Sequence, residues 1–387
     1  MKKRIFAIAL ALAMALAFTA CGGGSGSGGD AGSTPAPAAD PAPADPATDE
    51  HPDWIEMDII ASTFLPEGNP TNESYAALQA KLDKYMPGKI NIDVNYAGTL
   101  LSEQDTYDGL LSGTADMGIV SVARNVARFP LTQLFDYPGM AYNGSGAAAE
   151  AYWNWLQAEK PAEYNDIQVI MTQATGPMAL VSTAPVKEPG DVKGKQYRAD
   201  GVVGETVAAW GGIPVTIDDS ETYESIRSGL LQGSYSFYGG SAMNKLDEVA
   251  TDVMLSPLTN MSFFFGMNKD RFNEMPQSQQ DVFMQAALEA SQEYTWWFNE
   301  QNLKSNPVIV AFSKQMKHTL IPPGTPEWES FNDAGLVIRD AYVKSLDEQG
   351  LDGTGAIAKI EKYAADANAK YSWDEWLAYF PPLTMAD

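Results

Sequence analysis

The sequence contains one cysteine and two histidines in 387 residues. Because Cys21 is the only cysteine, no intramolecular disulfide can form, and a cysteine-rich metal site is excluded. His51 and His318 are far apart in the sequence, and we expect both to be solvated surface side chains. Zinc catalysis and Ser-His-Asp chemistry therefore lack their side chains, whereas a mechanism based on a pair of carboxylates stays open.

Positively charged residues are also scarce, because 25 Lys and Arg residues stand against 50 Asp and Glu residues, for a formal net charge of −25. Binding to nucleic acid through its phosphates requires a basic surface, so nucleic acid is excluded as a partner. The same charge predicts repulsion from an anionic lipid surface. A small anionic ligand is compatible with this composition where a local arginine reverses the field.

The longest apolar run lies at the N-terminus and is short for a membrane span. Ile5–Ala20 follows a basic segment, which predicts an export signal over residues 1–20. The next residue, Cys21, ends a Phe-Thr-Ala-Cys sequence that resembles a bacterial lipobox and predicts lipidation, with ordinary cleavage and a free cysteine as the alternative. Residues 21–53 form a linker rich in Gly, Ser, Pro and Ala that cannot build a core. We therefore expect an extracytoplasmic protein attached to the cell membrane only by its lipid.

Strand and helix patterns alternate from Trp54 onward. Residues 54–61 and 90–96 are predicted strands, and apolar residues recur at helical spacing over 75–85 between them. A short helix and a buried strand at 116–120 follow, so the order implies a parallel sheet covered by helices. Further strands are predicted at 168–172, 178–182, 196–199 and 262–267, and further helices at 206–210, 222–231, 276–302, 328–346 and 357–369.

Short motifs then occur in an order typical of one family. The strongest is the segment Val186–Arg198. On the strength of these motifs, the chain resembles the extracytoplasmic solute receptors of tripartite ATP-independent periplasmic (TRAP) transporters, of the DctP type. The resemblance covers roughly Ile55 to Leu346. The other motifs are Leu65–Pro70, Ala97–Glu103, Leu111–Asp116, Phe135–Pro138, Trp210–Pro214, Glu221–Tyr223, Leu231–Gly233, Met267–Asp270 and Met275-Pro276.

The resemblance implies an α/β fold of the two-lobed periplasmic-binding-protein (Venus flytrap) type. The chain would cross between the lobes near Gly176, Phe265 and Asn306, and a long helix would span both lobes. Ligand binding would close the lobes. The expected boundaries are residues 54–175 and 265–305 for lobe I, residues 176–264 and 306–346 for lobe II, and residues 347–387 for a C-terminal helical extension.

The same resemblance implies the function of a solute receptor that is not an enzyme. It would bind a small organic acid, or an amino-acid-like ligand, and deliver it to the small and large membrane subunits of a TRAP transporter. No cofactor and no metal are expected. Two other classes stay open at this point, namely a carboxylate-dependent hydrolase with a two-lobed cleft and a ligand sensor for a signalling kinase.

Arg198 occupies the position of the family's ligand arginine, and the resemblance implies that it anchors a carboxylate. A guanidinium can meet a carboxylate with two parallel hydrogen bonds, which lysine cannot copy. Met178 lies where some members carry a second arginine, and Gly239-Gly240 stand where the family has an amide, so these positions offer room but no side-chain donor. Asp219 is expected either to meet a ligand cation or to cap a helix.

Further ligand contacts are expected at Ser62, Thr63 and Ser121, which follow predicted strands at the edge where open α/β sheets bind ligands. Phe237 and Tyr238 are expected to form an aromatic wall, and Trp210 to pack in a core. Together with the missing second arginine, these residues predict a ligand with one carboxylate and a cationic or aromatic portion rather than a compact dicarboxylate. Two more arginines, Arg124 and Arg128, are expected to be solvated or to pair with surface acids.

Overall fold

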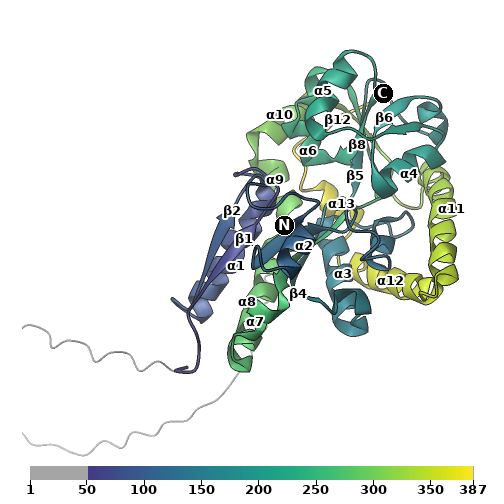
Figure 1. Ribbon diagram of the computed structural model, residues 1–387. Coiled ribbons are helices and arrows are strands. Elements are labelled where there is room, and N and C mark those ends of the chain that lie inside the picture. The colour runs from purple at the N-terminus through teal and green to yellow at the C-terminus, as the bar shows by residue number, and fades with distance from the viewer. Residues whose placement is uncertain (1–50, 387) are drawn as a thin grey trace, which may run out of the picture. The chain divides into compact units, whose positions relative to one another are not determined.

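The computed structural model describes residues 51–386, and two β-sheets covered by helices organise this part of the chain (Figure 1). The predicted α/β class is confirmed. The predictions for the export signal, for Cys21 and for nearly all of the linker concern residues 1–50, which lie outside the described residues. Between residues 51 and 386, no helix is long and apolar enough to cross a lipid bilayer.

The first sheet has the strand order β2-β1-β3-β10-β4. Strand β1 pairs in parallel with β2 and β3, as the alternating pattern predicts, whereas β10 runs antiparallel to β3 and β4. The helices α1 and α8 pack together on one face, and α3 packs against β4 on the other. The strands are β1 (Met57–Ser62), β2 (Ile90–Asn95), β3 (Met117–Ser121), β4 (Ile167–Ala174) and β10 (Ser262–Asn268), and the helices are α1 (Glu73–Tyr85), α2 (Thr106–Leu111), α3 (Ser145–Glu159), α7 (Lys269–Asn273) and α8 (Gln277–Glu293).

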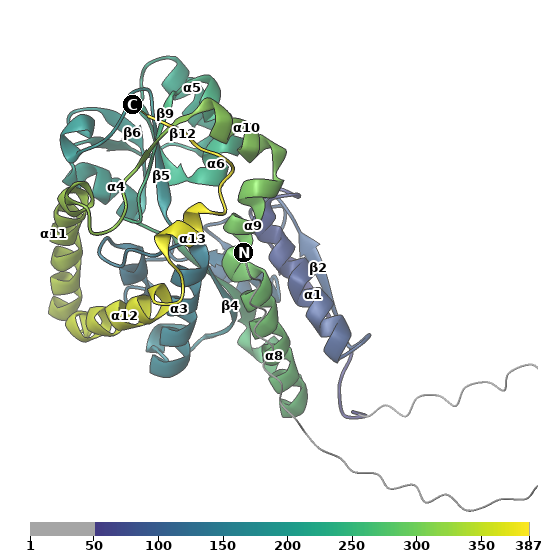
Figure 2. The same ribbon diagram turned by 180° about the vertical axis from the view of Figure 1, so that it is seen from behind.

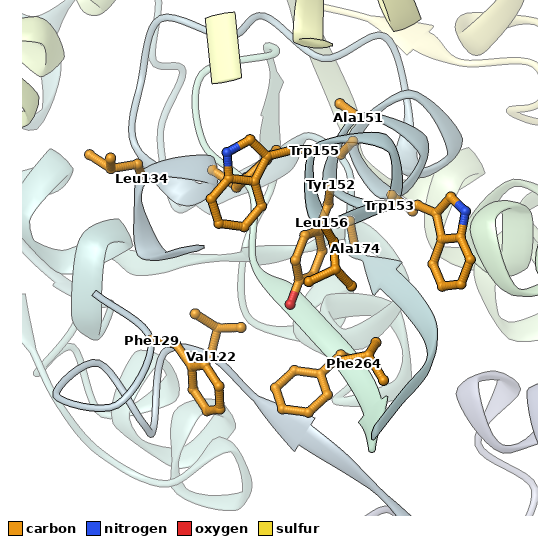
Figure 3. Packing of buried hydrophobic residues seen from close by; sticks show 14 of the residues in the cluster. Val122, Phe129, Leu134, Ala151, Tyr152, Trp153, Trp155, Leu156, Ala174 and Phe264 are labelled. Atoms are coloured by element: carbon orange, nitrogen blue, oxygen red, sulfur yellow. The ribbon is translucent and has the colours of Figure 1, made fainter. Parts of the chain in front are cut away.

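Consecutive phenylalanines in β10 show that both faces of this sheet are covered. Side chains alternate along a strand, so neighbours point to opposite faces. Phe264 packs in the cluster that holds Tyr152 of α3 (Figure 3), whereas Phe265 packs on the other face against Tyr75 of α1. Phe263, at the start of the strand, is only partly buried, and it lines a cavity.

The second sheet has the order β12-β11-β9-β5-β8-β6-β7. Its central strand β5 runs antiparallel to both neighbours, and β6 is parallel to β7 and β8. The strands are β5 (Met178–Ser182), β6 (Gln196–Arg198), β7 (Ile213–Val215), β8 (Gly233–Phe237), β9 (Asp252–Leu255), β11 (Lys317–Leu320) and β12 (Thr384–Met385), and the helices are α4 (Gly201–Ala209), α5 (Asp219–Arg227), α6 (Tyr238–Met243) and α10 (Pro307–Gln315). Short 3₁₀ helices are η1 (Pro70–Asn72), η2 (Thr132–Asp136), η3 (Ala162–Tyr164), η4 (Pro189–Val192) and η5 (Leu246–Glu248).

Two extended segments, between β4 and β5 and between β9 and β10, connect the sheets side by side. The backbone nitrogen of Thr175 donates to the carbonyl of Met261 at 3.0 Å. The Asn260 side-chain oxygen accepts from the backbone nitrogen of Gly176 at 2.9 Å. The second segment therefore crosses before β10 begins, earlier than the expected crossing near Phe265, because that residue is paired within the first sheet. The lobe boundaries given above stay a prediction.

A buried carboxylate lies beneath these crossing segments. Asp136 accepts hydrogen bonds from the Ser262 hydroxyl at 2.7 Å and from the Gln133 amide at 2.8 Å, and it also meets the Asn260 amide at 3.4 Å. Burial raises the pKa of Asp136 to about 7, although these hydrogen bonds oppose the shift. The polar network satisfies the buried groups at the point where the chain changes sheets.

The predicted long helix after Pro276 is interrupted, which corrects the expectation of one helix spanning both lobes. Helix α8 ends at Glu293, Tyr294 leaves helical geometry with φ −134° and ψ −60°, and η6 (Thr295–Trp297) and α9 (Phe298–Ser305) follow. Consecutive aromatic residues lie at the break: Trp296 is buried in the core cluster around α3, whereas Phe298 lines the cavity.

The C-terminal segment contacts helices beside both sheets and adds a strand to the second (Figure 2). Helix α11 (Pro326–Glu348) contacts α4, α12 (Gly353–Asn368) contacts α3, and β12 joins the second sheet after α13 (Trp373–Leu377). Glu300 of α9 holds the junction. Its carboxylate accepts hydrogen bonds from the Ser145 backbone nitrogen at 2.7 Å, the Ser145 hydroxyl and Nε1 of Trp376 at 3.1 Å. Burial raises the pKa of Glu300.

His318 is buried, which corrects the prediction of a solvated side chain. It is 0 % exposed, and its Nε2 lies 2.9 Å from the Tyr238 hydroxyl while its Nδ1 lies 3.2 Å from the Thr384 carbonyl. Burial lowers its pKa. The neighbouring lysines misled the prediction, because side chains alternate along β11 and His318 points inward where Lys317 is exposed.

Candidate functional site

The candidate site is a cavity of about 150 Å³ to which both sheets contribute. Arg198, Asp219 and Phe237, all predicted as site residues, line it together. Sequence reasoning missed the others as ligand contacts, because they come from loops and strand ends that are distant in the sequence. These further lining residues are Phe64, Leu65, Asn69, Thr71, Glu103, Ile119, Arg124, Gln173, Thr175, Asp200, Ser236, Met261, Phe263 and Phe298.

Arg198 is the last residue of β6 and is 9 % exposed. Its Nη2 lies 3.1 Å from Oδ1 of Asp219 and 3.6 Å from Oδ2 of Asp200, and its Nε donates to the carbonyl of Ile217 at 3.4 Å. These contacts hold the guanidinium at the cavity wall, at the carboxyl end of a parallel strand. This is the edge at which open α/β sheets place their ligands.

Asp219 does not cap its helix, and its role as a ligand contact stays a prediction. Helix α5 begins at Asp219 itself, and the preceding residue, Asp218, occupies the N-cap position without a side-chain capping bond. The Asp219 side chain is 53 % exposed, so it is not a buried acid either. Its carboxylate instead pairs with Arg198 from the first turn of the helix, where a negative charge is favourable.

Arg124 follows β3 and reaches across the cavity. It pairs with Glu103 at 3.3 Å and with Asp200 at 3.2 Å, which confirms the expected pairing with acids. Burial lowers the pKa of Arg124, but the two carboxylates outweigh this effect and raise it overall. With Arg198 and Asp219 included, the lining carries two arginines and three carboxylates, a formal charge of 2 − 3 = −1. Arg128 lies outside the lining and pairs with Asp108 at 2.6 Å.

Aromatic and aliphatic side chains form the remaining walls. Phe237 lines the cavity, but Tyr238 does not, because β8 ends between them and the Tyr238 hydroxyl is turned to His318 in the core. Trp210 packs in the core as predicted, and its Nε1 donates to the carbonyl of Phe331 at 3.0 Å. The expected two-residue aromatic wall is therefore replaced by phenylalanines from four separate segments: Phe64, Phe237, Phe263 and Phe298.

The space beside the two glycines that were expected to leave room for a ligand is occupied by neighbouring side chains. A Cβ on Gly240 would lie 2.5 Å from the ring of Phe237, and one on Gly239 would lie 3.4 Å from Cδ1 of Ile309. The absence of a side chain at Gly240 thus allows the Phe237 ring to take its place in the cavity wall. These glycines act through their neighbours and do not line the cavity.

Four more predicted contacts also lie outside the cavity lining. Met178 is 1 % exposed and packs in the core of the second sheet. The Thr63 hydroxyl donates to Oδ1 of Asn72 at 3.0 Å. The hydroxyls of Ser62 and Ser121 are buried at the ends of β1 and β3 and lack a hydrogen-bond partner in the described chain. Their roles as ligand contacts stay predictions.

Comparison with known proteins identifies the family. The family model for bacterial extracellular solute-binding proteins, family 7 (DctP), matches residues 61–344. A curated relative is the C4-dicarboxylate-binding periplasmic protein DctP of Rhodobacter capsulatus, which is 20% identical over 281 residues, or 70% of this chain and 83% of the relative.

Solved structures show the same two-lobed fold. A TRAP periplasmic solute-binding protein of Desulfovibrio salexigens, an open complex, superposes with a TM-score of 0.74 at 20% identity, covering 82% of this chain and 98% of its own. A TRAP solute-binding protein of Rhodoferax ferrireducens, in complex with copurified benzoate, gives a TM-score of 0.69 at 19% identity, covering 81% of this chain and 99% of its own.

Proposed function

The chain belongs to family 7 of the bacterial extracellular solute-binding proteins, the DctP-type receptors of TRAP transporters, and we propose that its ligand is an aromatic monocarboxylate held by Arg198. As a family member it is an extracytoplasmic receptor that works with TRAP membrane subunits, and it is not an enzyme. The observation that carries the ligand class is the pairing of the Arg198 guanidinium at the wall with a cavity of about 150 Å³ whose lining includes four phenylalanines.

The size and the walls of the cavity favour a single flat ring. An apolar cavity of about 150 Å³ lined by Leu, Ile and Phe is known to bind benzene. Phe64, Phe237, Phe263 and Phe298 supply comparable surfaces here, and offset or edge-to-face ring contacts add to the burial of apolar area. The Rhodoferax ferrireducens relative in complex with benzoate shows that this fold accommodates such a ligand.

The charges favour one carboxylate rather than two. Arg124, the other arginine of the lining, pairs with Glu103 and Asp200, so a second ligand carboxylate would compete with both acids for its guanidinium. The formal charge of the lining, −1, opposes the entry of a dianion, because an unpaired buried charge is costly. A ligand carboxylate would displace Asp219 from Arg198, which is feasible because the Asp219 side chain is half-exposed.

Titration calorimetry of the purified protein tests the ligand class. Benzoate or phenylacetate is expected to bind at least about tenfold more tightly than succinate or malate, since a second carboxylate would add a negative charge to a lining whose arginines are already paired with acids. Tightest binding to the dicarboxylates would contradict the proposal. Tightest binding to an amino acid would replace the aromatic class with a zwitterion whose ammonium group meets Asp219, and would leave only the Arg198 anchor.

The proposed attachment to the membrane is tested at the N-terminus. The export signal, the lipobox-like Phe-Thr-Ala-Cys sequence and the linker support lipidation of Cys21. Mass spectrometry is expected to find a diacylglyceryl-modified Cys21 as the first residue of the mature chain, and the Cys21→Ser variant is expected to leave the membrane fraction. An unmodified Cys21, or cleavage at another position, would exclude this anchor.

A further inference from the structure

One polar side chain of the cavity is left without a partner. Gln173 lies near the end of β4, is 1 % exposed and lines the cavity. Its Nε2 atom is buried and has no hydrogen-bond partner in the described chain. Two other polar side chains of the lining are engaged: Asn69 accepts from the backbone of Thr71 at 3.0 Å, and Thr175 accepts from the backbone of Met261 at 3.0 Å.

The position of Gln173 indicates that its unpaired Nε2 atom faces the cavity. It stands directly opposite Phe263 in the register of β4 and β10, so the two side chains share one face of the sheet and both reach the cavity. Buried side-chain amides have hydrogen-bond partners in the great majority of cases. An amide that lines a binding cavity and lacks a partner within the protein is therefore a candidate for bonding to a ligand. Ser62 and Ser121 also have unpaired hydroxyls, but they do not line the cavity.

Building on the proposed function, we infer that Gln173 selects ligands that carry an uncharged hydroxyl group on the body of the molecule, away from the carboxylate. A hydroxyl both donates and accepts, so it pairs with the side-chain amide through its nitrogen or its oxygen. A second carboxylate could also accept a hydrogen bond from Nε2, but it would bring a further negative charge into a lining with a formal charge of −1. The ligand class is thereby narrowed to hydroxylated monocarboxylates.

This assignment also gives the ligand two anchors on different sheets. Arg198 belongs to β6 of the second sheet, whereas Gln173 belongs to β4 of the first. A molecule that meets both groups is held fully only when the two sheets are near each other. Such differential contact is what allows a ligand to favour the closed arrangement of a two-lobed receptor.

The test is a double-mutant cycle between the ligand hydroxyl and the Gln173 side chain. Calorimetry compares benzoate with 3-hydroxybenzoate and 4-hydroxybenzoate, and phenylacetate with 3-hydroxyphenylacetate. In the unmodified protein, at least one hydroxylated acid is expected to bind about tenfold or more tightly than its parent, because the parent leaves the amide unpaired. In Gln173→Met, which keeps the length of the side chain, that ratio is expected to fall to about one to threefold.

The control is Gln168→Met on the same strand. Gln168 lies outside the cavity and donates to the carbonyl of Val169 at 2.9 Å, so its replacement should keep the hydroxyl preference. Thermal unfolding verifies the fold, and Gln173→Leu serves if the methionine variant is unstable. Equal affinity for parent and hydroxylated acids in the unmodified protein, or an unchanged preference in both Gln173 variants, overturns the inference.

Failure of the proposed ligand class gives a different result. If no aromatic acid binds but another monocarboxylate does, the aromatic class is wrong, and the cycle is run with that acid and the analogue that differs by one hydroxyl. If no carboxylate of any kind binds to the folded protein, both the proposed function and the role of Gln173 are overturned.

Discussion

Replacing Arg198 with lysine is expected to weaken binding of the carboxylate ligand by at least about 1.5 kcal/mol, or roughly tenfold, because lysine keeps the charge but cannot form two parallel hydrogen bonds. Arg198→Met is expected to have a larger effect, on the order of a hundredfold or more. It would remove the cation and leave the carboxylates of Asp200 and Asp219 facing an anionic ligand.

Calorimetry at two salt concentrations measures both variants, with Arg128→Lys as the matched control. Arg128 is also an ion-paired arginine, but its side chain is 45 % exposed and lies outside the cavity, so its replacement should leave affinity unchanged. Thermal unfolding checks that each variant is folded. Unchanged affinity in Arg198→Met would remove Arg198 from the site and make Arg124, across the cavity, the next arginine to replace.

Replacing Glu300 with alanine is expected to lower the free energy of unfolding by about 3 kcal/mol or more. The substitution removes a fully buried acceptor and leaves two donors unpaired, the Ser145 backbone nitrogen at the start of α3 and Nε1 of Trp376 in α13. The two donors belong to α3 and α13, so the contacts of both elements with α9 would weaken together. Chemical denaturation measures the effect, with the free energy of unfolding extrapolated linearly to zero denaturant.

Two further variants serve as comparisons for the loss of stability in Glu300→Ala. Glu300→Gln keeps one acceptor oxygen and is expected to lose less stability than Glu300→Ala. Glu293→Ala removes an acid whose side chain is 66 % exposed and pairs with Lys81 on the surface, so it should change stability by under about 1 kcal/mol. A loss below about 1 kcal/mol in Glu300→Ala would show that water or neighbouring groups replace the carboxylate at this junction.

The family, the α/β class and many of the strands follow from the sequence because they depend on local patterns. Alternating and continuous apolar runs predicted β1, β2, β3, β4, β5, β6 and β10, and the ordered motifs predicted the DctP family. The elements missed were strands β7, β8, β9, β11 and β12 and helices α3, α6, α7, α10 and α13. Their short or small-residue sequences acquire regular structure through pairing and packing with distant segments.

The candidate site could be predicted only in part for the same reason. The Val186–Arg198 motif predicts Arg198, but nothing near Gln173 or Arg124 in the sequence distinguishes them from ordinary strand and surface residues. Gln173 becomes visible as a candidate through the unpaired Nε2 atom beside the cavity, and Arg124 through its pairing with Asp200 across it. Both observations require side chains from separate elements to be placed together in space.

The sequence by itself determined the composition-based exclusions, the family and the position of the main candidate anchor, since these depend on residue types and their order along the chain. Only the tertiary structure decided which side chains share the cavity: that Tyr238 turns inward to His318, that Phe237 fills the space left by Gly240, and that Asp219 meets Arg198. The physical reason is that burial and pairing arise between residues far apart in the sequence, and a buried polar group takes whichever partner the packed fold brings within reach.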